Sequence, residues 1–121
     1  MFNAIEDMEK PMARDPDDLS TLEQRILLAL IRLQPNGYGV AIQDEIAERA
    51  GKTVSFGSIY ASLDRLEERG FVNSREGEAT PERGGRKKVY FTVSGLGRRA
   101  LDSSLNATDS LRVGIFEGAL S

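Results

Sequence analysis

The chain has 121 residues, of which 40% are hydrophobic and 29% are charged, and its formal net charge is −3. This size predicts a single domain with one hydrophobic core. The sequence contains no cysteine and no histidine. It therefore excludes a disulfide framework, a Cys/His zinc site and a Ser-His-Asp triad. An enzyme would have to rely on carboxylates, lysine or tyrosine alone, so we expect neither an enzyme nor a bound cofactor or metal.

Nothing in the sequence predicts a membrane or secreted protein. The longest uncharged apolar run, from Ile26 to Ile31, is too short to span a bilayer. Glu6, Asp7 and Glu9 occupy the region where a signal peptide carries basic residues. We therefore expect a cytoplasmic protein without a membrane partner.

The charges are unevenly distributed along the chain. Residues 1–24 contain seven acidic and two basic residues, whereas residues 83–99 contain six basic residues and no acidic one. The negative net charge argues against nucleic-acid binding, but the charge near a binding surface matters more than the total. The basic segment is compatible with a DNA-binding surface and also with a solvated loop.

The N-terminal residues 1–18 form an acidic arm with prolines at positions 11 and 16, for which we predict no fixed structure. The first predicted helix begins at Ser20, because Ser20 and Glu23 match the capping-box pattern. The helix ends before Pro35-Asn36-Gly37. Its apolar residues recur at helical spacing, namely Leu22, Ile26, Leu30 and Leu33.

Two further helices follow. The second is predicted over about residues 40–50 and ends at Gly51. Ser55 is the expected N-cap of a third helix over about residues 56–69, which Gly70 closes. This third helix has an inward face of Ile59, Leu63 and Leu66 and an opposite face of Ser58, Ala61, Ser62 and Arg65.

The remaining pattern predicts a hairpin and a last helix. Residues 71–75 and 89–93 alternate as two strands, and residues 77–86 form a basic, glycine-rich loop between them. Ser94 caps a helix from about residue 96 to 106 or beyond, with an apolar stripe of Leu96, Ala100, Leu101 and Leu105. This order predicts a winged helix-turn-helix fold, mainly α with a small β-hairpin. We divide the chain into the arm (1–18), the winged-helix domain (19–93) and a C-terminal dimerisation helix with its tail (94–121).

Three features of this arrangement favour DNA binding. A helix with small outward residues fits the major groove. The start of the third helix offers backbone N–H groups and serine hydroxyls to a phosphate. The loop supplies positive charge for the sugar-phosphate backbone, from Arg83, Arg86, Lys87 and Lys88. Each feature also has a purely structural interpretation, because solvated charges, helix caps and turn glycines are common.

Three stretches of the sequence resemble the PadR-like transcriptional regulators. The run from Ser55 to Glu67, followed by Gly70-Phe71-Val72, is the most specific, because its spacing and residue types match over many positions. The others are Gly37-Tyr38-Gly39 and the run from Gly85 to Ser94. The resemblance covers about residues 19–105, and the short tail is similar to the subgroup with one C-terminal helix. Departures from residues common in the family occur at Asn36, Ala61 and Ser94.

The resemblance implies a homodimeric, sequence-specific DNA-binding regulator, usually a repressor that a small aromatic or drug-like ligand relieves. Two-fold symmetry would set two recognition helices about 34 Å apart on a palindromic double-stranded operator. The expected groove contacts come from Ser58, Tyr60, Ser62 and Arg65, and backbone contacts from Tyr38, Ser55 and Gly57. The expected wing contacts come from Arg83, Arg86 and Lys87, and dimer contacts from Leu96, Leu101 and Leu105.

Two other functions stay open. Acidic residues near the basic surface would fit a winged-helix protein-protein interaction module without DNA binding; they are Glu67, Glu68, Glu76 and Glu78. A carboxylate-only enzyme has little support, because no paired-acid motif stands in a glycine-rich or metal-binding context.

Overall fold

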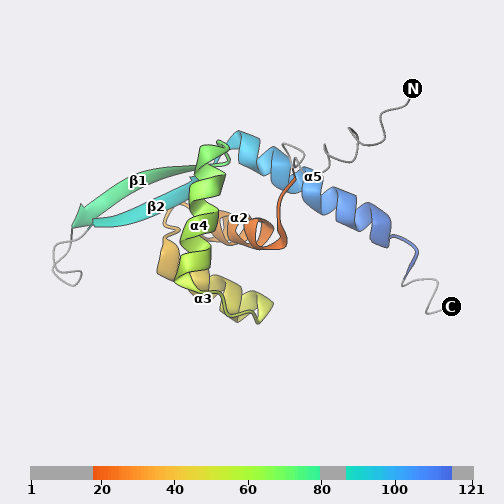
Figure 1. Ribbon diagram of the computed structural model, residues 1–121, viewed down its shortest axis with the longest axis horizontal. Coiled ribbons are helices and arrows are strands. Elements are labelled where there is room, and N and C mark those ends of the chain that lie inside the picture. Colours follow the sequence, from red (N-terminus) through yellow and green to blue (C-terminus); the bar gives the residue numbers. More distant parts are fainter. Residues whose placement is uncertain (1–17, 80–86, 116–121) are drawn as a thin grey trace, which may run out of the picture.

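The computed structural model describes residues 18–79 and 87–115. Its elements are α2 (Thr21–Leu33), α3 (Gly39–Ala50), α4 (Phe56–Glu68), β1 (Val72–Ala79), β2 (Lys87–Val93) and α5 (Gly95–Arg112). Figure 1 shows α2, α3 and α4 gathered in the middle of the molecule, with the β1–β2 hairpin extending to one side and α5 to the other. This is the predicted winged-helix arrangement. All of the predicted arm (1–18) except Asp18, and most of the predicted loop at 77–86, lie outside the described residues.

Helix α2 begins where the capping box predicts. The Glu23 backbone N–H donates to Ser20 Oγ at 3.1 Å, and the Ser20 N–H donates to Glu23 Oε1 at 2.8 Å. The helix then buries Ile26, Leu27 and Leu30 completely, so it forms the centre of the core. Full burial of each such side chain contributes about 1.5–3 kcal/mol relative to exposure.

Helices α3 and α4 close the core against α2. Helix α3 ends at Gly51, whose φ of 65° is the left-handed conformation typical of a helix C-terminus. Ser55 caps α4 by accepting a hydrogen bond from the Ser58 N–H at 3.1 Å. The α4 face that carries Leu63 and Leu66 is fully buried. Both helices therefore lie within one or two residues of their predicted bounds.

The hairpin is longer than the sequence predicts. Its strands pair antiparallel from Val72 opposite Val93 to Glu76 opposite Val89, with an irregularity before Ala79. The sequence predicts an alternating strand only as far as residue 75 and a loop from residue 77. The pairs Glu76–Val89 and Ala79–Lys87 carry the strand through this segment, across the irregularity between Glu76 and Ala79.

Helix α5 begins at the predicted cap, because Ser94 Oγ accepts a hydrogen bond from the Gly97 N–H at 3.0 Å. Its first half packs on the core and buries Ala100 and Leu101. Its second half continues to Arg112, in agreement with a predicted helix to residue 106 or beyond, and leaves Leu111 80% exposed. Among the described residues, no helix is long and apolar enough to cross a membrane.

Candidate nucleic-acid interface

The first turns of α4 form an exposed surface that carries serine hydroxyls together with the rings of Phe56 and Tyr60. The Ser55 hydroxyl caps the helix and also donates to Ser58 Oγ at 3.0 Å. Gly57 and Ser58 are exposed, and Tyr60 is 47% exposed. These four residues, which the sequence predicts as DNA contacts, therefore share one accessible helix end. Such an end presents backbone N–H groups to an anion.

One predicted groove residue lies elsewhere. Ser62 is fully buried, because it stands three residues after Ile59 and four before Leu66, on the same inward face of α4. Its hydroxyl accepts a hydrogen bond from Arg65 Nη2 at 3.1 Å. The expectation that Ser62 lies on the outward face beside Ser58 is therefore wrong, and its contact is with Arg65.

Arg65 faces the start of α2. Its Nε lies 3.8 Å from Oε2 of Glu23, a carboxylate that is fully buried, while the Arg65 side chain remains 53% exposed. Arg69 reaches the same carboxylate, with Nη1 3.8 Å from Glu23 Oε1. The sequence identifies Glu23 only as a helix cap. Its ion pairs with Arg65 and Arg69 join residues more than forty positions apart, so no neighbouring residue in the sequence indicates them.

The hairpin carries the predicted basic groups only in part. Lys87 is exposed, and its Nζ lies 3.7 Å from Glu76 Oε2 in an ion pair open to solvent. Arg83 and Arg86 lie outside the described residues. Lys88 is half-buried, and its Nζ lies 4.2 Å from the centre of the Tyr38 ring.

Tyr38 occupies the N-cap position of α3 and contacts the hairpin. Its ring meets the Tyr90 ring edge-on, with centroids 5.9 Å apart. The Arg75 guanidinium lies 4.6 Å from the centre of the Tyr90 ring on β2. The sequence analysis gives Arg75 no role. Strand alternation predicts that residues 88 and 90 share one face of β2. Only the pairing of the two strands, which sets Arg75 opposite Tyr90, shows that Arg75 lies beside this face.

The predicted dimer residues divide into two groups. Leu96 is 44% exposed and Leu105 is partly buried, whereas Leu101 is only 1% exposed within a single chain. Leu101 therefore belongs to the core of its own chain and is not free to contact a second one. The exposed apolar groups of this region lie further on, at Leu111, Val113 and Ile115.

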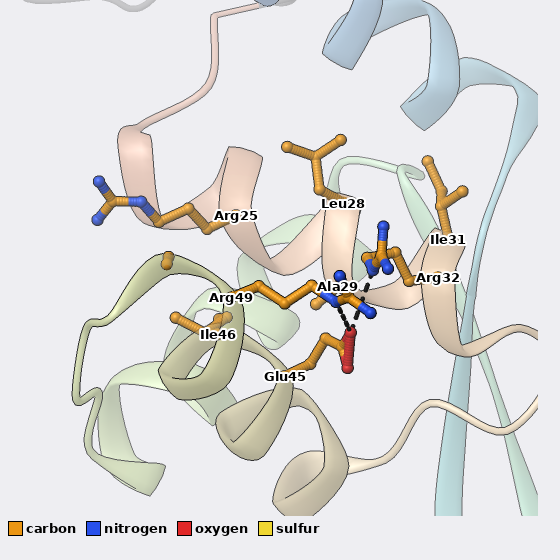
Figure 2. A pocket seen from close by; sticks show the side chains of 9 residues that line it. Arg25, Leu28, Ala29, Ile31, Arg32, Glu45, Ile46 and Arg49 are labelled. Carbon is orange, nitrogen blue, oxygen red and sulfur yellow. Dashed lines mark hydrogen bonds and ion pairs between the residues drawn. The ribbon is translucent and has the colours of Figure 1, made fainter.

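A separate pocket of about 430 Å³ lies between α2 and α3. Figure 2 shows Leu28, Ala29 and Ile46 along it, with Arg32 and Arg49 both reaching Glu45. The Arg49 and Arg32 Nε atoms lie 2.7 and 3.1 Å from Glu45 Oε1. Hydrogen bonds from Arg49 and then Arg32 lower the pKa of Glu45 below its ordinary value of 4.5. In the described part of the chain, no cluster of His, Cys, Asp or Glu could hold a metal ion.

Fold and surface together define a winged-helix protein with an exposed recognition helix. The model of the Transcriptional regulator PadR-like family matches residues 27–103, which is more than half of the chain. The chain therefore belongs to this family of transcriptional regulators and is not expected to act as an enzyme. A comparison with curated proteins finds no match.

Solved structures support the same fold. A protein of Thermoplasma acidophilum described as a transcriptional regulator is 25% identical, with a TM-score of 0.65 over 83% of this chain and 91% of the other. A PadR-like transcription factor of Bacteroides fragilis is 23% identical, with a TM-score of 0.66 over 96% and 98% of the two chains. Bacillus subtilis PadR, in complex with operator DNA, is 23% identical, with a TM-score of 0.61 over 71% of this chain and 48% of that one.

Proposed function

We propose that the protein is a homodimeric, sequence-specific DNA-binding repressor that acts in the cytoplasm on a palindromic operator. The observation that carries this proposal is the exposed, polar N-terminal end of α4, since an α-helix presented in this way fits the major groove. Bacillus subtilis PadR, which has the same fold, forms a complex with operator DNA.

The roles of individual residues follow from their exposure. Ser58 and Tyr60 would contact base edges, and the backbone around Ser55 and Gly57 would bind a phosphate. Tyr38, at the N-cap position of α3, contacts Tyr90 and Lys88 of the hairpin. Lys87 would bind the sugar-phosphate backbone, together with Arg83 and Arg86. Arg65 would reach DNA only by extending its exposed side chain away from Glu23.

Dimerisation would use the outer part of α5. Leu111, Val113 and Ile115 are exposed apolar residues close together in sequence, and water-exposed apolar patches mark contact surfaces. Leu96 and the exposed side of Leu105 could extend this surface along the helix. Two-fold pairing would set the two α4 helices about one DNA turn, or about 34 Å, apart.

Relief by a small ligand, such as an aromatic inducer, is the remaining part of the proposal. The pocket between α2 and α3, at about 430 Å³, falls within the range of small-molecule sites. A ligand bound there would contact α2 and α3 without touching the exposed end of α4. Its effect on DNA affinity would therefore have to pass through the packing of the three helices.

Selection of bound sequences from a random DNA pool tests the proposal, because a dimer should enrich a two-fold symmetric site. Fluorescence anisotropy on the selected site should give a log–log salt slope of about −5 if about six phosphates are neutralised. Lys87→Gln should reduce the magnitude of that slope by about 1. Arg49→Gln, which removes the same charge at the pocket between α2 and α3, is the matched control and should leave the slope unchanged.

Failure to enrich any sequence, together with binding that does not depend on salt, would overturn DNA binding. A protein partner captured by the same face would then favour a winged-helix interaction module. Enrichment of a single asymmetric half-site would contradict the dimer while leaving DNA binding in place.

A further inference from the structure

We propose that a series of aromatic contacts fixes the position of the hairpin relative to the recognition helix. The series runs from Tyr60 on α4 through Gly39 and Tyr38 at the start of α3 to Tyr90 on β2. The proposal rests on the proposed function, because it concerns how two DNA-binding parts are held in matching positions. In this proposal Tyr38 and Tyr90 are positioning residues, which affect DNA binding through the placement of the hairpin.

The hairpin needs such support for a physical reason. A two-stranded hairpin is marginally stable by itself and twists readily. The base of the hairpin is anchored by Val72 and Phe91, which are buried in the core. The strands continue several residues beyond this base, as far as Ala79 and Lys87. Contacts part-way along the strands are therefore needed to set the direction in which the hairpin points.

The first contact joins α4 to α3. A Cβ atom built on Gly39 would lie 2.2 Å from the Tyr60 hydroxyl oxygen and 2.6 Å from Tyr60 Cζ. The end of the Tyr60 ring therefore rests on the backbone at the start of α3, in space that any side chain at position 39 would occupy. This contact fixes the distance between the recognition helix and the residue that precedes Gly39, which is Tyr38.

The second contact joins Tyr38 to the hairpin. Its ring meets Tyr90 edge-on at 5.9 Å and 83°, within the favourable range for aromatic pairs. Lys88 covers the Tyr38 ring at 4.2 Å, and Arg75 covers the Tyr90 ring at 4.6 Å. Both distances suit a cation–π interaction. The four side chains therefore lie in the order cation, ring, ring, cation. We call this group the aromatic row, and it consists of Lys88, Tyr38, Tyr90 and Arg75.

The hairpin backbone is shaped to accept this row. A Cβ atom built on Gly77 would lie 2.5 Å from Tyr90 Cε2. The Tyr90 ring therefore lies across β1 only because position 77 has no side chain. Gly77 thus has a role in the hairpin that does not depend on unusual backbone angles.

The turn between α2 and α3 receives the hairpin at two more points. The Phe91 N–H donates to the Gly37 carbonyl oxygen at 2.7 Å, and Arg75 Nη2 donates to the Pro35 carbonyl oxygen at 3.1 Å. Arg75 therefore binds the turn with its guanidinium edge and covers Tyr90 with its face. Together with the aromatic row, these bonds connect the hairpin to the segment that also supports Tyr60.

NMR without DNA tests the row directly. In the full-length protein, the Tyr38 ring current should shift the Lys88 ε-methylene protons upfield. Tyr38→Leu should abolish this shift, and Tyr38→Phe should keep it. Val89→Ala changes an exposed neighbour on the opposite face of β2 and is the matched control; it should leave the Lys88 shift unchanged. A Lys88 shift that persists in Tyr38→Leu would overturn the proposal.

Anisotropy on the selected operator tests the consequence. Tyr38→Leu, Tyr90→Leu and Gly77→Ala should each weaken Kd by about three- to tenfold, the size expected for losing one or two such contacts. Val89→Ala should stay within about twofold of the wild type. Unchanged Kd values in variants that have lost the Lys88 shift would overturn the proposal.

Two further outcomes separate this proposal from its alternatives. If Tyr38→Phe weakens Kd as much as Tyr38→Leu while the Lys88 shift is intact, Tyr38 acts on DNA through its hydroxyl and the proposal is wrong. If the wild type binds no selected DNA, the proposed function fails. The NMR comparison then still decides whether the row holds the hairpin.

Discussion

Glu23 should be among the most sensitive positions for stability, because one buried carboxylate serves two helices. Its Oε1 accepts a hydrogen bond from the Ser20 N–H at the start of α2. Its two oxygens also lie 3.8 Å from nitrogens of Arg65, on α4, and of Arg69, at the end of that helix. Replacing Glu23 therefore disturbs both the cap of α2 and its connection to α4.

The expected magnitude follows from these two roles. Loss of a capping interaction costs about 1 kcal/mol. Removing one partner of a fully buried ion pair costs about 3–5 kcal/mol, but the Arg65 and Arg69 side chains are 53% and 24% exposed, so water recovers part of that cost. We expect Glu23→Ala to lower the free energy of unfolding by about 2–4 kcal/mol. Glu23→Gln keeps an oxygen for the Ser20 N–H and should cost about 1–2 kcal/mol.

Urea denaturation followed by far-UV circular dichroism measures both values, at one fixed protein concentration because the stability of the proposed dimer would depend on concentration. Glu48→Ala, an exposed carboxylate on α3, is the control and should change stability by less than about 0.5 kcal/mol. A loss below about 1 kcal/mol for Glu23→Ala would refute this reasoning. If Glu23→Ala and Glu23→Gln lower the free energy of unfolding equally, the lost charge and not the lost cap accounts for the effect.

Three further predictions concern the caps, the last helix and the pocket. Ser55→Ala removes the oxygen that accepts the Ser58 N–H and should cost about 1 kcal/mol, with faster hydrogen exchange in the first turn of α4; unchanged exchange would exclude the cap. Leu101→Ala should lower the free energy of unfolding by about 2–5 kcal/mol, whereas Leu111→Asp should dissociate the proposed dimer in sedimentation experiments with little change in stability. Dissociation by Leu101→Ala and unfolding by Leu111→Asp would contradict the placement of Leu101 in the core and of Leu111 in the dimer surface. The lowered pKa of Glu45 means that its ion pairs stabilise the fold above pH 4.5 and that this contribution disappears as the pH falls through the folded-state value. The difference in Tm between wild type and Glu45→Gln should therefore be present at neutral pH and vanish in strong acid; a constant difference would exclude that linkage.

Local signals predict the elements well because their causes are local. The hydroxyls of Ser20, Ser55 and Ser94 accept backbone hydrogen bonds from residues three positions later, so a short sequence window contains the whole interaction. Gly51 ends α3 by the same kind of short-range geometry. The hairpin bounds were less accurate, because strand pairing depends on a second strand that a short sequence window around β1 does not contain.

Side-chain placement was less predictable than the elements. The polarity of Ser62 suggested exposure, but Ser62 stands three residues after Ile59 and four before Leu66, on the inward face of α4, and is fully buried. Leu101 belongs to an apolar stripe that a partner chain or the chain's own core could cover, and the core covers it. In both cases the sequence supplies the periodicity, while the neighbouring element decides which side of the helix is buried.

The sequence by itself determined the family, the order of the elements and the helix caps, because motifs and caps depend on residues close together in the chain. Only the tertiary structure decided which distant groups meet. Tyr38 and Tyr90, or Glu23 and Arg65, lie more than forty residues apart, and their contact depends on helix packing and strand register. The predicted recognition helix thus remains the centre of the surface, but the residues that hold it in place became visible only in the folded chain.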